Sequence, residues 1–292
     1  MKIYDCTTFH SEHMMMDVRF NALNEHVHKF IVVESLFSHS GEKKKLNFDI
    51  NNYPKFKDKI IYLVIDREPD DLINPLNENI QYKRINSIKR IELSYDFMMS
   101  EIKKLSDNDL IILSDNDEIP NLDSDQFKDS NSDIYIFKQL FFYYKFNLLY
   151  DRMYWFGSKA CTKKKLKSLS WLRNLKNKKY PFWRVDTFFS KTKSSSLKII
   201  NDGGWHFTNV MTAENLYTKM TNFGHHDEFE LSELSVEDLK IKINQGLVFY
   251  DHFAGQEDKN KWEFNYKLKK ISDNLLPDSL IKDKIKLKEW FN

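Results

Sequence analysis

Glycine is scarce in this chain of 292 residues. It occurs 7 times, whereas average usage is roughly 7% of a sequence. None of the seven falls in the GxGxxG pattern of dinucleotide-binding folds or in the GxxxxGK[ST] pattern of P-loops. The sequence therefore excludes both phosphate-binding devices, and any nucleotide must be held in another way.

Cysteine is almost absent as well. Cys6 and Cys161 are the two in the sequence, and no CxxC or Cys/His zinc spacing occurs. A disulfide-based scaffold is excluded, so a reducing compartment is the simpler assumption. We expect both thiols to be buried as small apolar groups.

Long hydrophobic runs are missing. The longest, at 134–144, is interrupted by Lys138 and Gln139 and is far shorter than the roughly 20 residues that span a bilayer. The N-terminus reaches Asp5 without the apolar stretch of a secretory signal. We expect a soluble cytoplasmic protein, and peripheral contact with the inner face of the membrane stays open.

The chain also lacks an excess of charge of one sign. Lys and Arg number 45 against 43 Asp and Glu, which gives a formal net charge of +2. Domains that coat nucleic acid usually carry a strong basic excess, so we expect no nucleic-acid partner. Hydrophobic residues make up 41% of the chain, which is enough to form a core.

Apolar runs and helical spacing alternate along the first half of the chain. Strands are predicted at 1–5, 30–34, 60–65 and 110–113, and helices over about 12–27 and 79–105. This alternation predicts an α/β fold with a largely parallel, Rossmann-like sheet flanked by helices. The basic stretch 163–179 is interpreted as a mobile or anion-facing segment, and the last thirty residues as C-terminal surface helices.

Acidic residues follow three of the predicted strands. Glu34 and Asp66 each end one, and Asp115-Asn116-Asp117-Glu118 follows the third. Ligands of open α/β sheets bind at the carboxyl ends of the strands. Mg²⁺ and Mn²⁺ commonly bind through one or two carboxylates and substrate phosphates. The D-x-D therefore predicts a divalent cation that neutralises a diphosphate leaving group.

Several short strings occur in a characteristic order along the chain. They are MKIYDCTTF at 1–9, Arg19, Leu23, FIVVES at 30–35, HSG at 39–41, ILSDNDEIP at 112–120 and GWHF at 204–207. Together they resemble glycosyltransferase family 17. The resemblance covers roughly residues 1–250, and its most specific parts are the S-D-x-D-E-I-P and G-W-H-F strings. It implies a GT-A fold, a UDP-sugar donor (UDP-GlcNAc in known members), an inverting reaction and a divalent metal.

The chain departs from the family pattern at several places, among them Val248 and His252, where the family tends toward an acidic residue and an Arg. Asn116 stands between the aspartates where the family usually has a short hydrophobic residue. The H-x-E pair that follows the G-W-H block in the family corresponds here to His225-His226-Asp227-Glu228-Phe229. The matching histidine is therefore either His226 or His225.

With that resemblance, the D-x-D and G-W-H-F strings are interpreted as the metal and sugar site. Asp117 is expected to be the first metal ligand. Asp115 is expected to contact the metal, directly or through water, or the hydroxyls of the ribose or sugar. His206 would complete the coordination as a neutral imidazole, and Trp205 would stack on a sugar or base.

Residues nearer the N-terminus are expected to hold the nucleotide. Asp5 and Thr7, at the end of the first strand, are placed for the uracil and ribose. Glu34 either holds the nucleotide or orients Arg19, which we include among the donor-binding residues. Arg84 would neutralise diphosphate oxygens, because a planar guanidinium suits them.

An inverting transfer needs a general base to deprotonate the acceptor hydroxyl. Glu228 and Asp202 are the first candidates and Asp186 is the third. The sequence does not separate them.

The expected organisation is one GT-A-like domain over 1–255, followed by a C-terminal helical extension at 256–292. The nucleotide-sugar half spans about 1–120 and the acceptor half about 121–255. The expected partners are a nucleotide-sugar donor and a glycan acceptor. Two other functions stay open: a metal-dependent phosphohydrolase or nuclease, and a non-catalytic glycan-binding module that uses the many aromatic residues.

Overall fold

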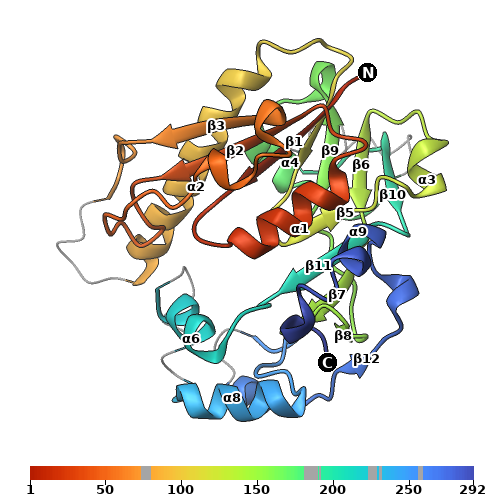
Figure 1. Cartoon of the computed structure of the whole chain (residues 1–292). Coiled ribbons are helices and arrows are strands. Elements are labelled where there is room, and N and C mark those ends of the chain that lie inside the picture. The colour runs from red at the N-terminus through yellow and green to blue at the C-terminus, as the bar shows by residue number, and fades with distance from the viewer. Residues whose placement is uncertain (74–79, 181–189, 191, 223–228, 230–231, 256–258) are drawn as a thin grey trace.

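Two β-sheets form the framework of the protein (Figure 1). The computed structural model describes residues 1–73, 80–180, 190, 192–222, 229, 232–255 and 259–292. The first sheet has seven strands in the order β10-β6-β9-β4-β1-β2-β3. Their bounds are β1 (Ile3–Thr8), β2 (Lys29–Ser35), β3 (Ile60–Ile65), β4 (Leu110–Leu113), β6 (Ile134–Phe137), β9 (Lys159–Thr162) and β10 (Leu197–Ile200).

The first sheet is mixed. The pairs β1–β2, β1–β4, β2–β3 and β6–β10 are parallel. β9 runs antiparallel to both β4 and β6, so the expectation of a largely parallel sheet is met only outside β9. The strands predicted at 30–34, 60–65 and 110–113 are confirmed, because continuous runs rich in Ile, Leu and Val suit strands that are buried on both faces.

Two helices cover opposite faces of this sheet (Figure 1). Phe30 and Val32 of β2 pack in the same core cluster as α1 (His13–Leu23). Ile31 and Val33 point the other way and pack with α2 (Ile80–Ile102). Successive side chains of a strand face opposite sides, so β2 joins two separate cores, and the helices predicted over 12–27 and 79–105 are confirmed.

The second sheet has five strands in the order β12-β8-β7-β11-β5. Its strands are β5 (Glu118–Pro120), β7 (Leu140–Tyr143), β8 (Leu148–Leu149), β11 (Gly204–Thr208) and β12 (Lys269–Lys270). The apolar run 134–144 is divided at Lys138 and Gln139 between β6 of the first sheet and β7 of the second. A third core cluster lies against β7, and α6 (Ala213–Asn222) and α8 (Val236–Gln245) contribute to it.

Shorter elements complete the chain. Among the described residues, no helix is both long and apolar enough to cross a bilayer. The short helices are α3 (Asp125–Lys128), α4 (Leu169–Arg173) and α9 (Asp278–Lys282), and the 3-10 turns are η1 (Ile50–Asn52), η2 (Lys57–Lys59), η3 (Lys163–Lys165), η4 (Lys259–Glu263), η5 (Asp273–Leu275) and η6 (Lys288–Trp290).

The C-terminus differs from its prediction, whereas the basic stretch differs only from the mobile alternative. Lys163 donates to the carbonyl of Leu105 at 2.6 Å, so the basic stretch begins as an anchored segment. The last thirty residues hold one five-residue helix and two 3-10 turns, with Leu276 and Leu280 buried in the core cluster of α1. They therefore pack as part of the body of the protein.

A glycine at the start of β11 lets this strand approach β5. The two strands are antiparallel, with Gly204 opposite Pro120 and His206 opposite Glu118. Gly204 has a φ of +106°, and a Cβ there would overlap the carbonyl oxygen of Ile119. Only glycine fits both requirements.

Replacing Gly204 by alanine is expected to destabilise the protein by about 2–4 kcal/mol, because the strained φ and the overlap with Ile119 act together. Chemical denaturation measures the change. Gly255→Ala is the control, since a Cβ at Gly255 meets nothing within 4 Å. Equal unfolding midpoints for the two variants would show that β5 and β11 can move apart at little cost.

Candidate active site

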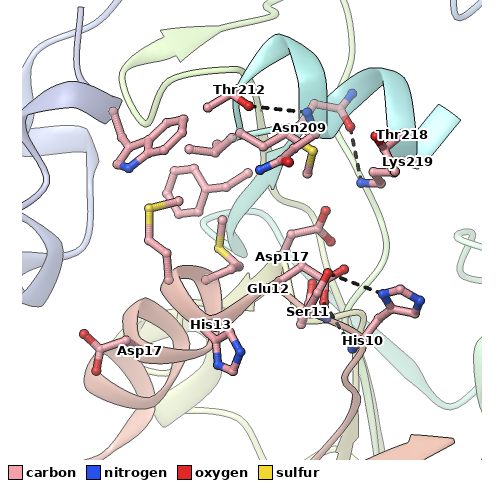
Figure 2. A pocket seen from close by; sticks show the side chains of 18 of the residues that line it. His10, Ser11, Glu12, His13, Asp17, Asp117, Asn209, Thr212, Thr218 and Lys219 are labelled. Atoms are coloured by element: carbon pink, nitrogen blue, oxygen red, sulfur yellow. Dashed lines mark hydrogen bonds between the residues drawn. The ribbon is translucent and has the colours of Figure 1, made fainter. Parts of the chain in front are cut away.

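Two cavities meet at the acidic loop between β4 and β5. The smaller, of about 500 Å³, lies at the ends of β1, β2 and β4. The larger, of about 1110 Å³, is bordered by the start of α1, the segment between β11 and α6, and residues 286–290 (Figure 2). The residues that line both are His10, Glu12, Lys44, Asn116, Asp117 and Lys219.

A buried ion pair supports the acidic loop from below. The Arg19 guanidinium donates to both carboxylate oxygens of Asp5, at 2.8 and 2.5 Å, and both side chains are fully buried. Its Nη1 donates to the carbonyls of Asp115 at 3.1 Å and Glu118 at 2.7 Å. Asp5 and Arg19 therefore bind each other, and Arg19 also binds the loop backbone, which corrects the expectation that they contact the nucleotide.

Glu118 is the buried anchor of the same loop. One of its oxygens accepts from Trp155 Nε1 at 2.6 Å, and the other accepts from the backbone N–H of Asp115 at 2.9 Å. Gly157 leaves room for this carboxylate, because a Cβ at that position would overlap it. Glu118 thus fixes the turn on which the two aspartates are carried.

Asp115 lines the smaller cavity and is bound by Arg173. Its Oδ2 lies 2.7 Å from Arg173 Nη2, and Arg173 Nη1 also reaches Glu118 at 3.3 Å. Withdrawal from solvent and the Glu118 charge raise the pKa of Asp115, and Arg173 opposes them. Arg173 was not among the predicted site residues. The signal that could have found it is a lone arginine inside the lysine-rich stretch 163–179.

Asp117 lines both cavities and lies beside His206. Its Oδ1 is 3.6 Å from His206 Nε2, and the imidazole packs against both Phe141 (centroids 4.8 Å apart) and Trp155 (4.7 Å). Burial opposes ionisation of Asp117, but His206 and Lys219 outweigh it and hold its pKa at about 2. The Asp117 carboxylate is therefore ionised at neutral pH.

The predicted metal ligands do not converge as a set of three. Among the described residues, no group of three or more His, Cys, Asp or Glu is placed to hold a metal ion. Asp115 is engaged by Arg173, whereas Asp117 faces both cavities with His206 beside it. The residues present fit a cation held chiefly by Asp117, with other oxygens supplied by a bound diphosphate or water.

Glu34 organises a segment of chain and does not contact Arg19. It is buried and accepts from Lys44 Nζ at 2.5 Å and Tyr62 Oη at 2.8 Å, as well as from the backbone N–H groups of Asn47 and Phe48. Lys44 is thereby held at the border of both cavities. The alternative in which Glu34 orients Arg19 is wrong, because Asp5 has that place.

Trp205 points away from the acidic loop. Its Nε1 donates to the carbonyl of Leu275 at 2.6 Å, and its side chain lines neither cavity. Neighbouring residues of a strand face opposite sides, so His206 faces Asp117 while Trp205 packs under the C-terminal segment. Trp155, which the sequence did not single out, is the tryptophan next to His206.

The remaining predicted residues lie outside the two cavities or outside the described residues. Thr7 is buried, with its hydroxyl 3.4 Å from the carbonyl of Thr8. Arg84 is exposed on α2. Asp202 is exposed and accepts from Asn121 Nδ2 at 2.9 Å. Glu228 and Asp186 lie outside the described residues, so their assignment stays a prediction.

A comparison with protein-family models decides the class of the protein. The model described as Glycosyltransferase family 17 matches residues 1–256. This chain belongs to glycosyltransferase family 17. It is therefore a glycosyltransferase enzyme that binds a sugar donor and a glycan acceptor, and the phosphohydrolase and glycan-binding alternatives are set aside.

Similarity of this family 17 glycosyltransferase to other proteins is weak. No curated protein matches it. The inositol-1-phosphate CTP transferase from T. maritima shares 15% identity and a TM-score of 0.30, over 56% of this chain and 71% of that one. The glycosyltransferase GlyE of Streptococcus pneumoniae TIGR4 shares 10% identity and a TM-score of 0.31, over 100% of this chain and 65% of that one. These scores are too low to support an argument about function.

The Arg19–Asp5 pair offers a direct test of the scaffold. Arg19→Met is expected to cost about 3–5 kcal/mol of stability, because it leaves the Asp5 carboxylate buried without a partner. Lys128→Met breaks an exposed pair with Asp123 and is expected to cost at most about 1 kcal/mol. Urea denaturation compares the two, and similar losses would contradict a supporting role for Arg19.

Proposed function

We propose that this glycosyltransferase moves a sugar, most simply GlcNAc, from a UDP-sugar to a glycan hydroxyl, with inversion and with a divalent cation. The observation that carries the proposal is the meeting of two cavities at Asn116 and Asp117. A transfer reaction needs one site for the donor and one for the acceptor, opening on a shared centre.

The smaller cavity suits the nucleotide diphosphate. It lies at the carboxyl ends of parallel strands, where α/β sheets bind their ligands. Lys44, Arg173 and Lys219 line it, so cationic groups would face the phosphate oxygens. The choice of UDP and of GlcNAc rests on the family resemblance.

Asp117 is the residue we assign to the cation, which we take to be Mn²⁺ or Mg²⁺. Its carboxylate borders both cavities and, with a pKa of about 2, is ionised throughout the neutral range. A bound cation would supply neutralisation of the charge that develops on the departing diphosphate. His206 keeps the Asp117 side chain in place from the side of the sheet.

The larger cavity suits a glycan acceptor. Tyr53, Met14, Met211 and Trp290 give it apolar walls, and the C–H faces of a pyranose ring can pack on such surfaces. Its volume of about 1110 Å³ is slightly above the usual range of roughly 300–1,000 Å³ for small-molecule sites, which leaves room for more than one sugar residue.

The wall at 286–290 lies beyond the residues that the family model matches. It is held firmly: the backbone N–H of Phe146 donates to the carbonyl of Trp290 at 2.9 Å, and Lys145 Nζ lies 5.4 Å from the Trp290 ring centroid. Asn147 and Asn292 also bond each other at 2.9 and 3.1 Å. This segment is therefore placed to influence the choice of acceptor.

Binding of UDP is expected to raise the melting temperature by about 5 °C at saturating concentration, and only when Mn²⁺ is present. Asp117→Asn should lose the Mn²⁺-dependent part of this shift and reduce transfer by about 100-fold or more. A differential-scanning experiment and a coupled UDP-release assay measure the two effects. The control is Asp123→Asn, an exposed aspartate outside both cavities. Full turnover by Asp117→Asn would refute the assignment.

Trp290→Ala is expected to raise the KM for a glycan acceptor about tenfold, the equivalent of about 1.4 kcal/mol of lost apolar contact. The KM for UDP-GlcNAc should not change, since Trp290 does not line the smaller cavity. The acceptor for this test is the best substrate in a pooled panel of p-nitrophenyl hexosides, found by mass spectrometry.

Trp290→Phe keeps an aromatic ring and should restore most of the acceptor affinity. Phe253→Ala removes an exposed ring outside both cavities and is the control. An unchanged acceptor KM in Trp290→Ala would place the acceptor elsewhere.

A further inference from the structure

We infer that Glu12 is the general base that takes the proton from the attacking acceptor hydroxyl. The inference rests on the proposed function and adds a catalytic residue to it. It starts from the place where the two cavities join, since the attacking oxygen and the anomeric carbon must meet there.

Two of the six residues that line both cavities are carboxylates, Glu12 and Asp117. The others are two lysines, a histidine and an asparagine. A lysine ammonium is a donor with no lone pair, and an amide is not a useful base. Within the described residues, the choice at this junction is therefore between the two acids and His10.

Asp117 is poorly suited to accept the proton. It lies 3.6 Å from His206, and Lys219 lines the same two cavities, so its carboxylate already faces basic side chains. Asp117 is better suited to hold positive charge at the donor side, the role assigned to it above.

His10 is less well placed to accept the proton, because one of its ring nitrogens already contacts a neighbouring side chain. Its side chain lies with Ser11, whose hydroxyl is 3.3 Å from His10 Nδ1. The Glu12 carboxylate, in contrast, carries the negative charge that stabilises a transferred proton.

Glu12 is fixed by backbone groups that leave one oxygen available. It is the residue directly before α1, and its Oε2 accepts from the N–H of Ser11 at 2.9 Å and of His10 at 3.2 Å. Among the described residues, Oε1 has no hydrogen-bond partner, and no lysine or arginine forms an ion pair with the carboxylate. Figure 2 shows Glu12 and Asp117 on the same side of the cavity, at the junction.

The candidates predicted from the sequence do not take this place in the described structure. Asp202 lines neither cavity and is bonded to Asn121. Glu228 and Asp186 lie outside the described residues. Nothing in the sequence distinguishes Glu12, because it precedes a helix and belongs to no motif.

The step balances as a single displacement. The acceptor oxygen forms a bond to the anomeric carbon as the bond from that carbon to the diphosphate oxygen breaks, and its electron pair leaves with UDP. The hydroxyl proton moves to Glu12 Oε1. The carboxylic acid then returns the proton to solvent.

The test uses azide, an anion that attacks carbon without losing a proton. Glu12→Gln is assayed with UDP-GlcNAc and Mn²⁺, once with the p-nitrophenyl hexoside panel and once with sodium azide. We expect transfer to hexosides to fall by about 100-fold or more. Formation of the inverted glycosyl azide should stay within about threefold of the native enzyme, because that reaction needs no base.

Glu25→Gln is the matched control, since Glu25 is exposed and lines neither cavity; it should change neither reaction. The Mn²⁺-dependent UDP shift of Glu12→Gln must equal that of the native enzyme, which separates chemistry from folding and donor binding. Glu12→Ala is the second variant if glutamine perturbs the loop.

Two results would overturn the inference: hexoside transfer within threefold of native in both Glu12 variants, or an equal loss of hexoside and azide reactions. A native enzyme that binds no UDP and transfers sugar to neither hexosides nor azide would instead refute the proposed function itself.

Discussion

The antiparallel pairing of β5 with β11 fixes the position of the acidic loop, and the site depends on it. Backbone bonds flank the pairing, from Phe207 N–H to the carbonyl of Asp117 at 2.9 Å and from Asn121 N–H to that of Gly203 at 3.0 Å. Gly204 allows the close approach. Because Arg19 holds the loop carbonyls from below, the loop is bound on two sides and its side chains have defined directions.

Burial and partners give the acids of this region different tasks. Asp5 and Glu118 are fully buried. Asp5 accepts hydrogen bonds from Arg19, and Glu118 accepts them from Trp155 and a backbone N–H. A buried carboxylate is tolerable only when its lone pairs are satisfied, so these two serve the scaffold. Asp115 and Asp117 reach the cavities, where Asp115 binds Arg173 and Asp117 lies beside His206.

Sequence patterns predicted the elements better than the contacts between them. The strands at 60–65 and 110–113 follow from unbroken apolar runs. The run at 110–113 is buried throughout, whereas the run at 60–65 forms an edge strand whose four inner residues are partly buried. The Arg173–Asp115 pair spans 58 residues, and no local pattern encodes such a partner. The prediction that Trp205 stacks on a sugar was wrong for a related reason. Alternation along a strand places Trp205 and His206 on opposite faces, but the sequence does not indicate which face borders the cavity.

The charges around the two cavities suit a displacement that moves negative charge toward the donor. Lys44, Lys219 and Arg173 border the smaller cavity, where a departing diphosphate would gain charge. The proton must leave on the other side, at the acceptor hydroxyl. Glu12 stands at the junction, held by two backbone N–H groups, so a base need not compete with the cations for the same oxygens. A carboxylate that already binds Arg173 or lies beside His206 could not accept the proton without losing that contact. Glu12 forms no ion pair among the described residues, so it is the carboxylate suited to accept the proton.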